Sequence, residues 1–177
     1  ASQYRVMAGL EGNHFGWEWD SAIGSMSSTA TQKQHGARDR AGYYDAIVNG
    51  EYKFGAVNSP AVLNKMFPEY GSHGTSTQTF FDFKASRELM ALSGGPLQLA
   101  TGLDLRHESF EQASSDNVLN AQIVQFSGVS IQGSRNVSAA FAELSAPFTK
   151  QLEGSFALRA DKSGQTEAAA EPKFGLS

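Results

Sequence analysis

The sequence has no cysteine, little charge and no long apolar run. Without cysteine it can form neither a disulfide framework nor a thiolate metal site. Charged residues make up 18% of the chain, below the roughly 25% of average soluble domains. No apolar stretch approaches the ~18 residues of a membrane-spanning helix, which excludes a helical membrane protein. The net charge is −4 and there is no basic cluster, which argues against nucleic acid as a partner.

The chain also lacks a signal peptide at its start. Residues 1–3 (ASQ) already resemble the beginning of a strand, so we expect either a mature form or an excised piece of a longer protein. Its 177 residues are enough for one domain with a sizeable core, and nothing in the sequence suggests two. We therefore predict a single domain.

Regular alternation between residues 80 and 110 is the strongest feature that the sequence does have. Apolar residues recur at every second position on both sides of a turn at residues 92–96 (LSGGP). A period of two is that of an extended strand, whose side chains point alternately to its two faces. Phe81, Phe83, Ala85 and Arg87 share one face of the first expected strand, and one face of the second carries Leu97, Leu99, Thr101, Leu103 and Leu105.

The alternation from Leu97 onward is longer than a globular strand requires. Ordinary strands average about five or six residues, whereas a tilted strand that crosses a bilayer needs about nine to eleven. We predict an all-β fold, an antiparallel meander of long hairpins that forms part of a transmembrane β-barrel with two long loops. The expected strands lie near residues 3–11, 16–30, 79–89, 97–111, 135–146, 153–161 and 172–177, and the long loops at 34–76 and 112–134.

Short turns and long loops alternate along the chain. The expected turns at 12–14 (GNH), 92–96 and 147–151 (PFTKQ) are short, whereas both long loops lie at the opposite ends of the strands. This is the plan of an outer-membrane barrel with periplasmic turns and extracellular loops. Next to the first turn stand Phe15, Trp17 and Trp19, where such a barrel places its interfacial aromatic residues. Within the first long loop, Ser59 and Pro60 favour the start of a short helix.

Few residues suggest chemistry. Asp104, His107 and Glu108 are metal-ligand types, but on a strand His107 lies on the face opposite the two acids, so the three cannot converge. Glu18 and Asp20 share a face and could be a carboxylate pair for glycoside hydrolysis, yet lumen-facing acids of a barrel give the same pattern, which we prefer. No phosphate loop, nucleophile elbow or HExxH motif occurs. We expect no enzyme, no metal and no cofactor.

Four aromatic residues in the first long loop are candidates for ligand binding. Aromatic rings stack on ligands in many binding sites, and they equally pack a loop on itself. The sequence leaves both alternatives open. The four residues are Tyr43, Tyr44, Tyr52 and Phe54.

Several segments resemble those of one family of membrane proteins. They are residues 15–20 (FGWEWD), 84–89 (KASREL), 94–97 (GGPL), 103–110 (LDLRHESF), 133–144 (GSRNVSAAFAEL) and 172–176 (PKFGL). In this order they resemble barrel segments of TonB-dependent outer-membrane receptors. The resemblance covers most of the chain outside the first long loop.

The resemblance implies a parent protein in the bacterial outer membrane that actively takes up a scarce small molecule, such as siderophore-bound iron, cobalamin or an oligosaccharide. Members of this family combine an N-terminal plug domain, which contacts the TonB protein, with a barrel of about 22 strands. Neither the plug nor its TonB-contacting segment is visible in this sequence. The chain would then be one part of the barrel wall, with outer-membrane lipid and a small-molecule ligand as partners, and would not transport by itself.

Two other classes of protein stay open. One is a soluble all-β ligand-binding module, either a sandwich or a lipocalin-like barrel; the other is a small outer-membrane barrel of about eight strands that acts as an adhesin or structural protein. An isolated barrel fragment would expose unpaired edge strands and its lipid-facing rows of side chains. We therefore expect such a fragment to self-associate through sheet edges or apolar faces.

Overall fold

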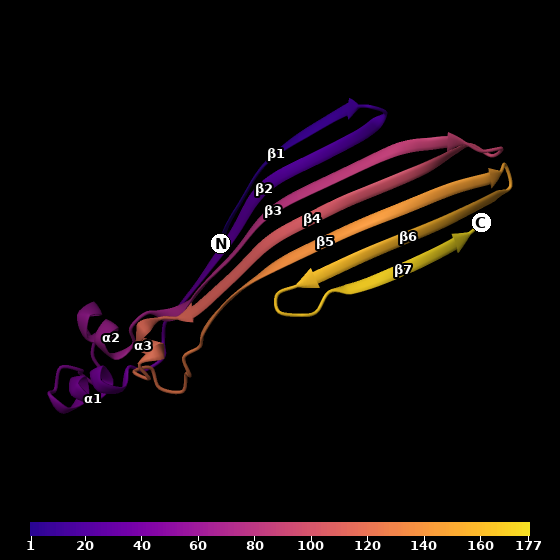
Figure 1. The fold of residues 1–177 in the computed structure, drawn as a ribbon. Helices are drawn as coiled ribbons and strands as arrows, with labels where there is room; N and C mark the ends of the chain where they lie inside the picture. The colour runs from indigo at the N-terminus through magenta and orange to yellow at the C-terminus, as the bar shows by residue number, and fades with distance from the viewer. The chain divides into compact units, whose positions relative to one another are not determined.

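The computed structural model describes residues 1–177, and the chain is all-β. Seven antiparallel strands pair in the order of the sequence, from β1 to β7, in one open sheet (Figure 1). Strands that follow one another in the chain are therefore neighbours in the sheet, which confirms the predicted antiparallel meander. The strands are β1 (Ser2–His14), β2 (Trp17–Gln34), β3 (Tyr70–Ala91), β4 (Pro96–Ser114), β5 (Ser130–Thr149), β6 (Leu152–Ser163) and β7 (Ala169–Leu176).

Most strands extend beyond the ranges that the alternation predicts. The 22-residue strand β3 begins at Tyr70, inside the segment 34–76 predicted as a long loop. Its first half is rich in Gly, Ser and Thr and has no apolar alternation, so the signal of period two is missing although the backbone ladder forms. For the same reason the second loop, predicted at 112–134, is shorter: β4 continues to Ser114 and β5 begins at Ser130.

Tight turns join β1 to β2 and β3 to β4. The first turn is formed by Phe15 and Gly16, which both have positive φ (51° and 75°), and not by residues 12–14 as predicted. Positive φ at both central residues gives the hairpin turn whose twist matches that of the strands. Phenylalanine rarely takes this conformation, so the residue pattern predicts no turn at Phe15. At the second turn, which confirms the prediction at 92–96, the Leu92 N–H donates to the Gly95 carbonyl (2.9 Å).

Three short helices lie in the long connections: α1 (Arg40–Val48), α2 (Pro60–Met66) and α3 (Asp116–Leu119). The predicted helix at Ser59 and Pro60 is confirmed as α2, whose first turn is capped by the Ser59 hydroxyl accepting from the Val62 N–H (3.4 Å). The sequence pattern does not predict α1, which Asp39 caps by accepting from the Gly42 N–H (2.7 Å). None of the three helices is long and apolar enough to cross a membrane.

The chain divides into two compact units, which are described separately. The loop unit comprises Ala1–Gln3, Ser28–Ser76 and Phe110–Gly133, and the sheet unit comprises Tyr4–Ser27, Thr77–Ser109 and Ser134–Ser177. Strands β1 to β5 have residues in both units, so no linker separates the two units in the sequence.

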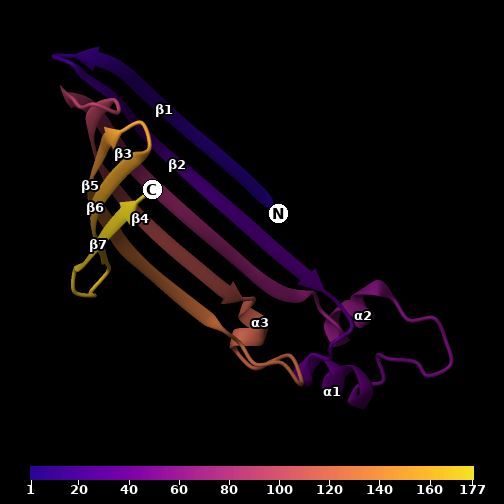
Figure 2. The same ribbon diagram turned by 90° about the vertical axis from the view of Figure 1, so that its right-hand side faces the viewer.

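The loop unit has a small hydrophobic core that joins the two long connections. Tyr70, Val118 and Ile123 are buried against one another. The Arg40 N–H at the start of α1 donates to the Gln122 carbonyl (2.8 Å), which ties the first connection to the second. Figure 2 shows the three helices of this unit, which are parts of these two connections. The long loops are therefore partly folded on each other rather than extended.

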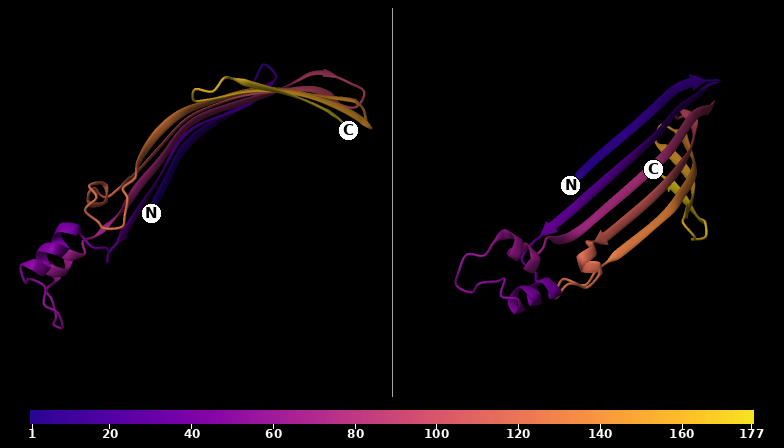
Figure 3. Two further views of the ribbon diagram at one scale, coloured as in Figure 1. Left: turned by 90° about the horizontal axis from the view of Figure 1, so that it is seen from below. Right: turned by 90° about the vertical axis from the view of Figure 1, so that its left-hand side faces the viewer.

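The sheet unit is a single layer of strands, which the left view of Figure 3 shows nearly edge-on. Its buried hydrophobic residues are the small ones Ala85, Ala139 and Ala146. Larger apolar side chains stay exposed, among them Leu10 (72%) and Ile23 (61%). A globular domain normally buries the apolar face of a sheet under a second layer. Within this unit no second layer covers that face.

Candidate functional site

Contacts between neighbouring strands show which side chains share a face of the sheet. Because successive residues of a strand point to opposite faces, one contact or paired position aligns two whole strands. A set of such pairs runs from β1 to β7 on one face. The pairs are Gly12 with Trp19, Trp19 with Phe83, Thr77 with Ser109, His107 with Asn136, Ala142 with Leu158, and Phe156 with Phe174.

This face is apolar, and we call it the apolar face. Its large side chains are open to solvent, for example Val6 (68% exposed) and Phe174 (81%). Within the sheet unit, to which this name is restricted, Arg87 and Lys162 are the charged strand residues with this orientation, and both lie close to a strand end. The apolar face carries Tyr4, Val6, Ala8, Leu10, Trp17, Trp19, Ile23, Phe81, Phe83, Ala85, Leu97, Leu99, Leu103, Leu105, Ala140, Ala142, Leu144, Phe156, Leu158, Phe174 and Leu176.

The opposite face, which we call the charged face, carries the other charged strand residues of the sheet unit. Two aromatic rings also lie on it: Phe80 covers Gly24, and Phe141 covers Gly102. The segment 135–145, whose orientation the sequence leaves open, contributes Arg135 to this face. Its charged residues are Arg5, Glu11, Glu18, Asp20, Asp82, Lys84, Glu88, Asp104, Arg106, Glu108, Arg135, Glu143, Glu153, Arg159, Asp161, Glu171 and Lys173.

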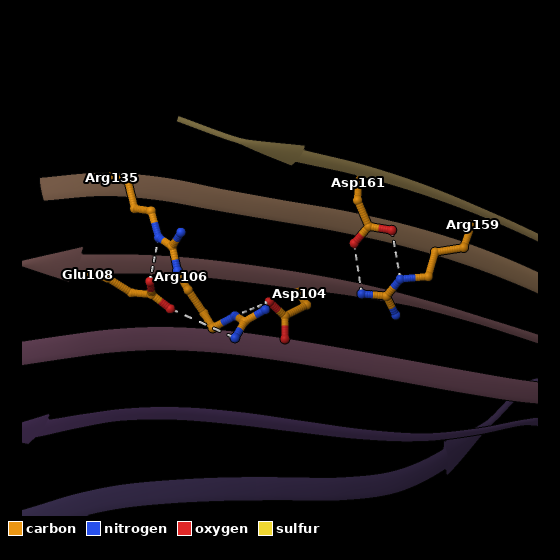
Figure 4. Close-up of polar contacts among 6 residues, drawn as sticks. All are labelled: Asp104, Arg106, Glu108, Arg135, Arg159 and Asp161. Carbon is orange, nitrogen blue, oxygen red and sulfur yellow. Dashed lines mark hydrogen bonds and ion pairs between the residues drawn. The ribbon is translucent and has the colours of Figure 1, made fainter. Parts of the chain in front are cut away.

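Arg106 lies at the centre of an ionic chain on the charged face (Figure 4). Its Nε is 2.8 Å from Oδ1 of Asp104, and its Nη1 is 3.9 Å from Oε1 of Glu108. Glu108 also accepts from Nε of Arg135 at 2.7 Å, which bridges β4 and β5. Two carboxylates and two guanidinium groups therefore balance one another in this part of the sheet.

A second ion pair lies on β6, where Arg159 donates from Nε and Nη2 to both carboxylate oxygens of Asp161 (2.8 and 2.9 Å; Figure 4). Sequence reasoning missed these arginines as elements of the site. The available signal was their spacing, because Arg106 and Arg159 each stand two residues from an acid and so share a strand face with it. Arg135 had no such signal, since its partner is on another strand.

The three possible metal ligands Asp104, His107 and Glu108 lie on opposite faces. The two acids bind arginines on the charged face, whereas Nδ1 of His107 lies 2.7 Å from Oδ1 of Asn136 on the apolar face. Their positions agree with the alternation of a strand. The residues that were considered together as metal ligands thus take part in separate contacts.

Glu18 and Asp20 lie together on the charged face, where they line a hollow of about 670 Å³. Glu11 and Lys84 belong to the same lining. Both Glu18 and Asp20 are exposed. This arrangement is a solvated wall of carboxylates and one ammonium group, which can contact polar or cationic solutes.

A second hollow, of about 760 Å³, crosses the middle of β1 to β5. Each of these strands contributes three consecutive residues to it, and the outer two of each triplet belong to the apolar face. On the charged face the same level is filled by Phe80, whose ring covers Gly24. The hollow is therefore a groove on the apolar face, lined by the side chains of Val6, Ala8, Ile23, Ser25, Thr79, Phe81, Leu105, His107, Asn136 and Ser138.

The four aromatic candidates for ligand binding lie on α1 and just after it. Tyr43 is packed edge-on against Phe67, with ring centroids 6.0 Å apart, and Tyr52 packs edge-on against Phe54 at 5.1 Å. Tyr44 is 66% exposed and Phe54 is 77% exposed. Tyr43 and Tyr52 thus help to hold the segment together, and Tyr44 and Phe54 are accessible to a ligand.

Glu69 forms the main ion pair of the loop unit. Its carboxylate lies 2.8 Å from Nζ of Lys33 and 3.6 Å from Nε2 of His35. The hydrogen bond from Lys33 holds the pKa of the Glu69 carboxyl below its ordinary value, and the nearby charges of Lys33 and His35 act in the same direction. This pair links the end of β2 to the start of β3.

No model of a known protein family matches the chain, and no curated protein matches it. A functional proposal therefore depends on the sequence pattern and on the geometry of the two faces.

Proposed function

We propose that this chain is a barrel segment of a TonB-dependent outer-membrane receptor, a bacterial protein that actively takes up a scarce small molecule. The separation of the apolar face from the charged face, maintained over seven strands, is the observation that carries the proposal. In a membrane barrel the apolar face would contact lipid hydrocarbon, and the charged face would line an aqueous lumen.

The apolar face has about the height that a bilayer requires. On β4, apolar residues from Leu97 to Leu105 extend over about 27 Å at about 3.4 Å per residue. A strand that is tilted by about 45° needs about nine to eleven residues to cross the hydrocarbon, and residues 97–105 are nine. Beyond Leu105 the next residues of β4 on this face within the sheet unit are His107 and Ser109, which are polar. Such a continuation is typical of strands that leave the membrane and enter water.

The distribution of charge also favours a membrane barrel. A charged side chain at the bilayer centre costs about 2.5–3.5 kcal/mol or more, and the two charged residues of the apolar face, Arg87 and Lys162, lie close to strand ends. On the charged face, by contrast, Arg106 and Glu108 keep side-chain exposures of 34% and 26%. Partly hydrated ion pairs of this kind suit a water-filled interior.

The remaining partners follow from the family resemblance. A receptor barrel of about 22 strands needs further strands on both sides of an open sheet such as this one. The TonB protein would act through a plug domain, no part of which is recognised in residues 1–177. A small-molecule ligand would meet the accessible aromatic rings of Tyr44 and Phe54.

A soluble ligand-binding module is the competing function. Such a module would cover the apolar face with a second sheet or a helix layer. The exposure of Leu10 and Ile23 in a single-layered sheet unit therefore favours the membrane protein.

Spin labels on two adjacent residues of β4 test the proposal. The chain has no native cysteine, so each label attaches only at the introduced cysteine. Leu103→Cys and Asp104→Cys would each be labelled with a nitroxide in the whole chain, in phosphatidylcholine vesicles. We expect the label at 103 to collide mainly with oxygen, which concentrates in lipid, and the label at 104 mainly with a water-soluble nickel chelate. A label at 103 that neither reagent reaches, in a sample that sedimentation shows to be monomeric, would mean that residues of the same chain cover the apolar face, as in the soluble module.

Membership of the receptor class requires a separate test in cells that express the full-length parent protein. The measured quantity is accumulation of radiolabelled ferric siderophore, cobalamin or oligosaccharide, with and without TonB. We expect one of these ligands to accumulate in a TonB-dependent way. A membrane barrel without any TonB-dependent uptake would instead favour the adhesin or structural barrel.

A further inference from the structure

The groove on the apolar face has two chemically different walls. The wall nearer the short turns contains Ile23, Phe81 and Leu105, whose side chains are 61%, 36% and 41% exposed. The other wall contains Ser25, Thr79 and His107, which lie two residues farther from the short turns on the same three strands. Polarity therefore changes across the groove on three neighbouring strands at one level.

Beyond the polar wall the same face stays polar. The next residues with this orientation are Ser27 on β2, Thr77 on β3 and Ser109 on β4. The hydroxyl groups of Thr77 and Ser109 lie 2.6 Å apart, which shows that they share the face. On β2, β3 and β4 the change at the groove is thus an edge of the apolar band and not a local substitution in one strand, whereas on β1 both groove residues, Val6 and Ala8, are apolar.

We propose that this groove binds the interfacial region of membrane lipids and so fixes the depth of the chain in the bilayer. The acyl methylene groups next to the ester would contact Ile23, Phe81 and Leu105, and the ester and phosphate oxygens would accept hydrogen bonds from the hydroxyl groups of Ser25 and Thr79. This inference rests on the proposed function, and adds to it the level at which the sheet leaves the hydrocarbon.

The chemistry of the polar wall supports lipid rather than a water-soluble ligand as the occupant. The hydroxyl groups of Ser25 and Thr79 are neutral donors, and the Nδ1–H of His107 donates to Oδ1 of Asn136. The ester and phosphate oxygens of a lipid are hydrogen-bond acceptors that lie next to its hydrocarbon chains. The polar wall matches the oxygens, and the apolar wall matches the hydrocarbon. The apolar wall is also continuous with the exposed apolar face, so lipid that covers this face extends into the groove.

A series of nitroxide labels along β4 locates the boundary. Leu103→Cys, Leu105→Cys, His107→Cys and Ser109→Cys all point to the same face, two residues apart, and each would be labelled in the whole chain in phosphatidylcholine vesicles. We expect the ratio of oxygen to nickel-chelate collisions to stay high at 103 and 105 and to fall severalfold at 107 and 109. Because His107→Cys removes the contact with Asn136, the pair Ile23→Cys and Ser25→Cys repeats the comparison on β2.

The possible outcomes separate this inference from the proposed function. If the labels at 103 and 105 contact lipid, and oxygen collisions remain dominant at 107, 109 and 25, the sheet is in the membrane but its boundary is not at the groove, and the inference is wrong. The same conclusion follows if the nickel chelate already dominates at both 105 and 23. If neither reagent reaches the label at 103 in a monomeric sample, the membrane proposal and this inference both fail.

Discussion

The ring of Phe141 on β5 occupies the space above Gly102 on β4, where the side chain of any larger residue would have to be. A Cβ atom at position 102 would also lie within 2.9 Å of the Phe83 carbonyl oxygen on β3. Phe80 covers Gly24 on the same face in a similar way. Glycine thus lets large aromatic rings pack directly against the backbone of the charged face.

The first prediction is that Gly102→Ala destabilises the sheet unit by about 1–3 kcal/mol, the usual cost of overpacking a filled site. Unfolding in urea, followed by circular dichroism in detergent micelles, measures the change. Gly133→Ala is the matched control, because Gly133 is also a strand residue and has no atom within 4 Å of its added Cβ. Equal midpoints for the two variants would show that the contact between Phe141 and Gly102 does not constrain the sheet.

Much of the fold could be predicted because a strand with one apolar and one polar face has apolar and polar residues in alternation along its sequence. The run from Leu97 to Leu105 predicts β4, and the turn at 92–96 is marked by two glycines and a proline. The pattern fails from Tyr70 to Thr79, because hydroxyl side chains and glycines lie on both faces there and leave no period to detect. The position of the turn at Phe15 could not be predicted either, since phenylalanine rarely adopts a positive φ.

The second prediction concerns the ionic chain around Glu108. Glu108→Gln removes the charge that pairs with both Arg106 and Arg135, and we expect it to lower the free energy of unfolding by at most about 1 kcal/mol, because these groups are partly hydrated. The loss should shrink in 1 M salt, where the screening length is about 3 Å. Glu143→Gln is the control, since Glu143 lies on the same face without an ion pair. A loss of the same size for both variants, or one that salt does not change, would contradict an electrostatic role.

The third prediction is a low titration midpoint for Glu69, measured from its carboxyl carbon by NMR. The hydrogen bond from Lys33 lowers the folded-state pKa below the ordinary value of 4.5, so the pair stabilises the loop unit above that pH. The contribution is lost as the pH falls through the lower folded-state pKa. Lys33→Met should return the midpoint of Glu69 toward 4.5, whereas Lys53→Met, a change of charge elsewhere in the loop unit, should leave it unchanged. A midpoint that does not respond to Lys33→Met would disprove the pair in solution.

The candidate site was less predictable than the fold. Strand alternation correctly separates His107 from Asp104 and Glu108, because that prediction needs only one strand. The contact between Glu108 and Arg135 depends on the register between two strands whose residues are 27 positions apart, and no local pattern encodes this register. Helix α1 and the packing of Tyr43 likewise depend on contacts with residues far along the chain.

The last prediction separates the structural aromatic residues from the accessible ones. Tyr43 packs against Phe67 and lies under the guanidinium group of Arg38 (5.5 Å), whereas the neighbouring Tyr44 is 66% exposed. Tyr43→Ala should therefore destabilise the loop unit by about 1–2 kcal/mol, through lost ring packing and cation–π attraction. Tyr44→Ala should change stability by less than about 0.5 kcal/mol, as surface substitutions usually do. Hydrogen exchange of the α1 amides measures both effects, since exchange in Tyr43→Ala should accelerate throughout the helix.

In the full-length parent protein Tyr44→Ala should weaken ligand binding without this acceleration, because an exposed ring can contribute contact area to a ligand without supporting the helix. Faster exchange in Tyr44→Ala than in Tyr43→Ala would reverse the assignment of the two rings.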